Sequence, residues 1–427
     1  MRPKHLWGCL ILIALTGCGA NNAEPLSVDF VNPLTDINIS LAFTCQHETI
    51  PATSAEADVL FHYARWLQKN NQLKQDKTVD AEIARLYRIA SENGHYKANI
   101  NLQNGAMRGT FKLRGEEHLR MSEQLINAGV AAGYYFVGIF LQHGAAGLQQ
   151  DHEIALRYYR KAADEGNALA QTYVADKLAP INIAPDVARQ MRRCAAEQGN
   201  GKAAVALGIN LKNKGEYQEA LELFQMGVVA GNDGAAGRLE KGFRDPKPDN
   251  RLHYLGQQED LERADRYKKI WKILSGYSYA NPKVPEINEI VPLPPAPLPS
   301  WDGKLQWLEE RLANVPPEKP SEALINQLAK AKLLDPATGQ GLPGSPAFSQ
   351  SHLSAPNCHS GQACPVSGYW KVGWLPRHHS VDRSVARYFE QGEILPTQLV
   401  QRYQMRTWPF SDRITRHEQA VEWYLLG

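Results

Sequence analysis

Between residues 80 and 242 the chain is an alanine-rich helical pattern that ends in glycine five times. The five endings read SENGHYKAN, NAGVAAGYY, DEGNALAQT, EQGNGKAAV and VAGNDGAAG. Glycine after the last helical turn fits a left-handed C-cap, a conformation that costs other residues about 1 kcal/mol. A pattern that recurs every few tens of residues predicts a solenoid of stacked helix pairs. The marker glycines are Gly94, Gly129, Gly166, Gly199 and Gly231.

Small residues in the turn before each glycine predict that neighbouring helices approach closely. The third unit has Ala162 and Ala163 there, and the fourth has Ala195 and Ala196. After each glycine a second helix resumes, so each unit is a helix pair. We expect all four alanines to be buried where adjacent helices touch.

The first and last units depart from the pattern. Gln103 and Glu240 stand where the middle units have a second glycine. Divergent end units are expected of caps. Upstream, residues 55–69 have the apolar spacing of a helix that covers the first unit. We therefore predict a solenoid over residues 55–242, including this N-terminal cap.

The pattern stops after residue 242, and two further parts are predicted. Residues 243–300 contain an amphipathic helix, from about Leu255 to Leu274, that should pack on the last unit. A proline-rich stretch follows that can be neither helix nor central strand, and its interleaved apolar residues predict an extended strap. Residues 301–427 are predicted to form a small C-terminal α+β module. The overall class is mainly all-α.

The N-terminus has the pattern of a bacterial secretory signal. Arg2 and Lys4 precede an apolar run that ends at Leu15 and is too short to cross a bilayer. The next residues, Thr16-Gly17-Cys18, complete a sequence that resembles the lipobox of bacterial lipoproteins. That resemblance implies lipidation of Cys18, with residues 19–54 as a tether that includes a short extended segment held at Cys45. An ordinary signal peptide cut nearby is the alternative.

The absence of aspartate after Cys18 implies, by resemblance to lipoprotein sorting rules, that the protein is anchored on the periplasmic side of the outer membrane.

The charge balance argues against one class of partner. The full chain has 47 Lys+Arg and 45 Asp+Glu, so loss of Arg2 and Lys4 leaves 45 of each. A neutral mature chain argues against a nucleic-acid partner, whose binding depends on uncompensated basic charge.

Four cysteines remain after the signal, and the periplasm permits disulfides. Cys358 and Cys364 lie close together in a Pro/Gly-rich segment, and we predict a disulfide between them. Cys45 and Cys194 could form a second, long-range pair, although sequence does not fix that connectivity.

No recognisable catalytic constellation occurs in the chain. The zinc-protease helix, the nucleophile elbow and the phosphate-binding glycine loop are all missing from the sequence. Histidines and cysteines near the C-terminus could bind zinc, but their spacing matches no usual ligand pattern. We therefore predict no catalytic residue, no metal and no cofactor. The histidines and cysteines of this C-terminal group are His352, Cys358, His359, Cys364, His378 and His379.

The third unit, GVAAGYYFVGIFLQHGAAGLQQDHEIALRYYRKAADEG, resembles the Sel-like repeats (SLR), which are relatives of the tetratricopeptide repeat. This resemblance implies a right-handed helical-repeat solenoid. The order of segments resembles SLR lipoproteins found beside type VI secretion phospholipase effectors. The segments that carry this resemblance are the lipobox, the repeats, FRDPKPDNRLHYLG, the proline-rich strap, CPVSGYW and the tail from FEQGEILP to EWYLLG.

In that family the protein is an immunity factor that binds an antibacterial lipase in the periplasm. The resemblance therefore implies a phospholipase effector as the protein partner, although it does not identify the contacting residues. Two other functions stay open. One is an SLR adaptor that scaffolds envelope assembly or signalling. The other is an enzyme with an unrecognised site in the C-terminal module.

Overall fold

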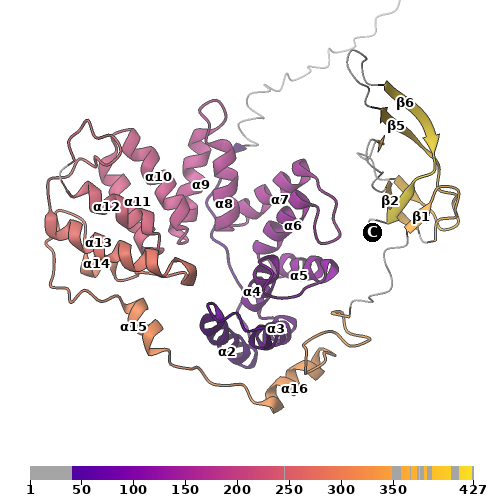
Figure 1. Ribbon diagram of the computed structural model, residues 1–427, viewed down its shortest axis with the longest axis horizontal. Helices are drawn as coiled ribbons and strands as arrows, with labels where there is room; N and C mark the ends of the chain where they lie inside the picture. The colour runs from indigo at the N-terminus through magenta and orange to yellow at the C-terminus, as the bar shows by residue number, and fades with distance from the viewer. Residues whose placement is uncertain are drawn as a thin grey trace, which may run out of the picture.

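The structure is a computed structural model, and it shows a curved stack of helices followed by a small strand-rich module (Figure 1). Cys18 and the rest of the signal segment lie outside the described residues, as do His352 and His378. None of the helices in the described part of the chain is long and apolar enough to span a bilayer. The described residues are 41–244, 246–348, 357–365, 367–372, 375, 379–381, 387–404 and 413–425.

Twelve consecutive helices build the solenoid, and they alternate in direction as helix pairs. The fold is the predicted mainly α-helical SLR solenoid, with α2 as its N-terminal cap and α13 as its C-terminal cap (Figure 1). The helices are α2 (Ala55–Asn71), α3 (Lys77–Glu92), α4 (Tyr96–Met107), α5 (Gly115–Asn127), α6 (Ala132–His143), α7 (His152–Asp164), α8 (Ala168–Leu178), α9 (Pro185–Glu197), α10 (Gly201–Asn213), α11 (Tyr217–Val229), α12 (Asp233–Gly242) and α13 (Leu261–Gly276).

A glycine-asparagine step ends the first helix of a pair and begins the second. The side chains of Asn167, Asn200 and Asn232 each accept a hydrogen bond from the backbone N–H three residues later. The glycines just before them have φ values of +102°, +81° and +80°. The step therefore supplies the left-handed C-cap of one helix and the N-cap of the next.

Small residues set the close spacing of the helices, as predicted. Ala162, Ala163 and Ala195 are fully buried, and Ala196 is 3% exposed. A second example is Gly208, where an added Cβ would lie 2.7 Å from the ring of Phe224. Larger side chains at these positions would force neighbouring helices apart.

Gln103 marks a polar contact between α4 and α5, where the middle units use glycine. It is fully buried, and its amide donates to Asn99 Oδ1 at 2.8 Å. Its own Oε1 accepts from Ser122 Oγ at 3.2 Å and lies 3.3 Å from His118 Nδ1. This hydrogen-bonded layer satisfies the buried polar atoms between the first repeat and the second.

Residues 42–50, here called the N-terminal strap, pack across the middle repeats rather than hanging free. Cys45 is disulfide-bonded to Cys194 of α9. The carbonyl of Gln46 accepts from Gln171 Nε2 at 2.9 Å. An added Cβ on Gly166 would lie 2.6 Å from Glu48 N, so the glycine turn allows the strap to cross closely. Residues 42–50 of the predicted tether, residues 19–54, are therefore packed on the solenoid and do not act as a free tether.

Residues 282–348, here called the belt, run from the last repeat back to the first. The belt contains α14 (Ile287–Ile290), α15 (Gln306–Ala313) and α16 (Glu322–Ala331), and it follows a short 3-10 helix, η1 (Ser278–Ala280). At its start, Val284 N donates to Val229 O at 3.1 Å. The start of the belt packs on the solenoid surface through Val284, Ile287 and Val291, as the interleaved apolar residues predicted. The prediction that this stretch contains no helix is wrong at one point, because residues 287–290 form the helical turn α14 between prolines.

The far end of the belt packs on the first repeat. Ile325, Leu328 and Ala329 of α16 are buried in one hydrophobic cluster with side chains of α2, α3 and α4. The predicted domain boundary at residue 301 does not match this packing, because α16 lies beyond it and buries its apolar residues against the solenoid. Sequence spacing alone did not reveal that distant partner.

In the described residues of the small C-terminal module, seven strands form two sheets. One sheet has the order β1-β7-β2-β4 and the other β3-β5-β6, with antiparallel pairing throughout. Trp370 and Trp423 are buried at its core. The strands are β1 (Asn357–His359), β2 (Gly368–Val372), β3 (His379–Ser380), β4 (Arg387–Phe389), β5 (Gln398–Gln404), β6 (Arg413–Gln419) and β7 (Glu422–Leu425).

The disulfide predicted between Cys358 and Cys364 is not formed, and this prediction is wrong. Both side chains are buried thiols in the hydrophobic cluster of the module. The Cys358 thiol lies 3.4 Å from two acceptors, Gln362 Oε1 and Ala363 O, in the turn after β1. Packing and hydrogen bonding therefore satisfy this thiol without a cross-link.

Candidate protein-binding site

The belt and η1 bring the two ends of the solenoid together at α2. Gln72 Nε2 donates to Tyr279 O at 3.2 Å. Asn70 and Asn314 exchange two side-chain hydrogen bonds, of 3.2 and 2.8 Å. Trp66 Nε1 also reaches Asn314 O at 3.4 Å. The curved stack is thus closed by contacts between residues more than two hundred positions apart.

Two adjoining hollows lie at this junction, with volumes of about 750 and 370 Å³. They share a wall made by α2 and η1, so we treat them as one feature and call it the closure groove. Polar and aromatic side chains dominate its lining. The shared lining residues are Arg65, Gln68, Gln72, Ala280 and Asn281.

The closure groove has an excess of basic side chains. Arg65, Lys69, Arg108 and Arg311 line it, and among the described lining residues only Glu310 remains as an acid outside an ion pair. The two other charged groups, Lys77 and Asp80, pair with each other at 3.0 Å. Burial, followed by repulsion from Arg311, lowers the pKa of Lys69. A surface of this kind attracts acidic groups on a partner.

Three aromatic rings surround the guanidinium of Arg311. Its carbon lies 5.9 Å from the ring centre of Tyr277, 5.6 Å from Tyr279 and 5.6 Å from Trp307. Cation–π contacts hold an arginine in a fixed orientation while leaving its N–H groups able to bind a carboxylate. Tyrosine, tryptophan and arginine are also the residues that contribute most to protein–protein binding.

None of the sequence-predicted site residues lies in the closure groove. Cys18 falls outside the described residues, and Cys358 and Cys364 belong to the strand-rich module. A local signal for the groove was present, since Trp307 and Arg311 are spaced four apart on one helix. The contact between Arg311 and Tyr277 could not be predicted from the sequence, because the two residues lie on separate segments.

Cys45, His47 and Cys194 form the one cluster with metal-ligand chemistry found among the described residues. Their ligand atoms lie within 4.8 Å of one another. The two sulfurs are bonded to each other, however, so they do not present thiolates. In this oxidised state the cluster does not fit a zinc site.

A family model and several solved structures resemble parts of the chain. The model DUF6396, described as a domain of unknown function, matches residues 235–343. This range begins in α12 and ends within the belt, so it covers the segment that closes the solenoid. No curated protein matches the chain.

Three of the similar solved structures come from Pseudomonas aeruginosa. The first, named Pseudomonas aeruginosa 5086 (PA5086), is 26% identical, with a TM-score of 0.45 over 60% of this chain and 96% of its own. Immunity protein Pa5087 is 24% identical, with a TM-score of 0.47 over 60% and 96%. Immunity protein PA5088 is also 24% identical, with a TM-score of 0.47 over 60% and 95%. This chain is thus similar to solved proteins that include immunity proteins.

Proposed function

We propose that this protein is a periplasmic immunity protein that binds and neutralises an antibacterial phospholipase effector of a type VI secretion system. In this proposal Cys18 carries a lipid that anchors the chain to the outer membrane. The order of segments in the sequence supports the role, and the closure groove supports protein binding as the means. Neutralisation needs no catalysis by this chain, because covering the active site or the membrane-docking face of the lipase is sufficient.

The placement of Arg311 in the closure groove is the observation that carries the binding proposal. Its guanidinium is oriented by three aromatic rings before a partner arrives, so little conformational entropy is lost on binding. The surrounding basic residues would draw an acidic surface of the effector toward the groove. A stable complex buries about 1,600 Å² in total, so the contact would extend from the groove onto neighbouring helices.

The test uses the lipase encoded beside this protein, expressed in the periplasm with and without it. Survival and co-purification of the two proteins are measured together. Arg311→Ala should weaken the complex by about tenfold or more, because it removes a central arginine. Arg157→Ala on α7 is the matched control, since Arg157 is 75% exposed and, among the described residues, forms an ion pair only with its helix neighbour Glu153.

Other outcomes of this experiment would favour a different function or a different binding site. Death of the cells despite co-expression would favour an envelope adaptor. Survival without a detectable complex would favour an unrecognised enzyme. A complex that both variants leave intact would move the binding site away from the closure groove while keeping the proposed role.

A further inference from the structure

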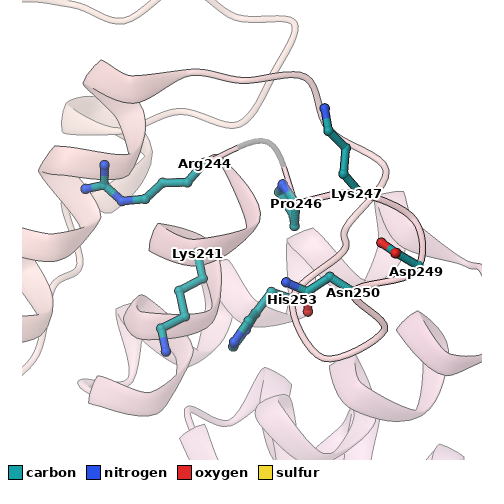
Figure 2. A pocket seen from close by; sticks show the side chains of 7 residues that line it. All are labelled: Lys241, Arg244, Pro246, Lys247, Asp249, Asn250 and His253. Carbon is teal, nitrogen blue, oxygen red and sulfur yellow. The ribbon is translucent and has the colours of Figure 1, made fainter.

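A second hollow, apart from the closure groove, lies where α12 ends and the following loop turns back (Figure 2). Its volume is about 410 Å³. Figure 2 shows Lys241, Asn250 and His253 gathered on one side, whereas the Arg244 side chain points away. The described residues that line it are Lys241, Arg244, Pro246, Lys247, Asp249, Asn250 and His253.

Two further basic side chains, Lys212 and Arg238, lie close to His253 of this hollow. Lys212 of α10 is 8% exposed, and its ammonium donates to the carbonyl of Arg251. Arg238 of α12 lies over the ring of Phe224, with its guanidinium carbon 6.0 Å from the ring centre. Three elements of the fold therefore bring basic groups to one place.

These basic groups affect one another. Burial is the main cause that lowers the pKa of His253, and the charges of Lys241, Arg238 and Lys212 lower it further. Burial and repulsion from Arg238 lower the pKa of Lys212 as well. Buried cations normally have an anionic partner, because their desolvation is otherwise uncompensated.

Nearby acids do not fill that role in the described part of the chain. Glu240 and Asp265 both bind Arg244, at 2.6 Å each. Asp249 lies on the lining of the hollow, in the same loop as Lys247. No ion pair joins a described carboxylate to Lys212, Arg238 or Lys241.

His253 adds an unsatisfied polar atom in the wall of the hollow. Its Nδ1 atom is buried and has no hydrogen-bond partner among the described residues. A polar atom in that position is costly unless a ligand or water satisfies it. The same ring lines the hollow, where an anion would contact it.

We propose that this hollow binds a phosphate group. Lys241 and Asn250 would donate hydrogen bonds to the phosphate oxygens, with His253 as a third donor and the charge of Lys212 behind them. The group could belong to inorganic phosphate or to the phosphodiester of an anionic phospholipid, since both present the same oxygens. This site does not depend on the proposed immunity role.

The first experiment titrates the purified mature protein with inorganic phosphate and follows the imidazole resonances of His253 by NMR. Saturable shifts and an increase in the His253 pKa are expected, because a bound anion stabilises the protonated ring. Lys241→Ala should weaken phosphate binding by about tenfold, the effect of one charged hydrogen bond. Lys177→Ala is the control, since that lysine lies over Tyr173 on α8.

The second experiment separates the two sources of phosphate. A soluble Cys18→Ala variant is mixed with vesicles of phosphatidylglycerol or of phosphatidylcholine, and co-sedimentation is measured. Binding to phosphatidylglycerol that Lys241→Ala abolishes would assign a lipid headgroup, whereas binding of inorganic phosphate alone would assign the free ion. Absence of saturable phosphate shifts, or an equal loss in the two lysine variants, would overturn the proposal.

Discussion

Cys45 and Cys194 lie 149 positions apart in the chain and are joined by a disulfide, with 5.5 Å between their Cα atoms. The bond fixes the N-terminal strap to α9, so the cap helix and the first helix pairs lie inside one covalent loop. Two hydrogen bonds hold the same strap just beyond Cys45, since Gln171 Nε2 donates to Gln46 O and Glu48 N donates to Gln198 Oε1. The N-terminus is therefore a structural part of the solenoid from residue 42 onward.

Loss of this disulfide should destabilise the solenoid. Closing so long a loop removes much of the entropy of the unfolded chain, so Cys45→Ser should lower the free energy of unfolding by about 4 kcal/mol. Denaturant unfolding with and without dithiothreitol measures the effect. A Cys45→Ser/Cys194→Ser variant should be insensitive to the reductant. An unchanged wild-type midpoint under reducing conditions would contradict the prediction.

Glu48 should make stability depend on pH. Its carboxylate accepts from Ala132 N at 2.6 Å and from Asn167 Nδ2 at 3.1 Å. Burial is nevertheless the larger influence, and it raises the pKa of Glu48 above 4.5. The folded state thus holds the proton of Glu48 more tightly than the unfolded state does. The free energy of unfolding therefore falls as the pH rises from 4.5 through the raised pKa of Glu48.

Glu48→Gln should abolish the pH dependence of stability that Glu48 contributes, because the amide keeps an acceptor for Ala132 N but cannot ionise. The free energy of unfolding of the wild type, measured relative to Glu48→Gln, should therefore decrease as the pH rises above 4.5. Glu153→Gln, at an exposed position of α7, provides the control. Parallel pH profiles for the wild type and Glu48→Gln would show that Glu48 is not buried in this way.

Overpacking of the alanine contacts should be costly. Ala163→Leu or Ala196→Leu would insert a larger side chain between touching helices and cost roughly 1–3 kcal/mol. Ala81→Leu is the matched control, because Ala81 is exposed on α3. Thermal unfolding should show lower melting temperatures for the first two variants only. Three equal melting temperatures would mean that these contacts can relax.

Arg85 should hold the end of the belt against the first repeat. Its guanidinium donates to Pro336 O at 2.6 Å and to Glu322 Oε2 at 2.8 Å. Arg85→Ala removes both bonds and should destabilise this contact by about 2 kcal/mol. Hydrogen exchange should then become faster in α16 and stay unchanged in α8. Protection of α16 equal to the wild type would show that its apolar face is sufficient.

Cys18 is expected to determine membrane attachment. Cys18→Ala should move the protein from the membrane fraction to the soluble fraction, because the acyl acceptor is lost. Fractionation and palmitate labelling of both forms measure this. Membrane attachment with retained labelling in Cys18→Ala would refute lipidation at this position.

The helix pairs could be predicted from sequence because their determinants are local. The glycine-asparagine step caps two helices within a few residues, and alanine spacing marks the touching faces. Ala163 and Ala195 are buried as expected, and so are Val284 and Val291 of the proline-rich segment. Each of these features follows from residues that are neighbours in the chain.

Long-range relationships were decided only by the tertiary structure. Cysteine spacing favoured Cys358 with Cys364, yet those two are buried free thiols, whereas the N-terminal strap packs on α8 and α9 and brings Cys45 to Cys194. The apolar face of α16 was visible in sequence, although its partner surface on the first repeat was not. The closure groove draws residues from α2, η1 and α15, and no local pattern specifies that these distant segments will meet.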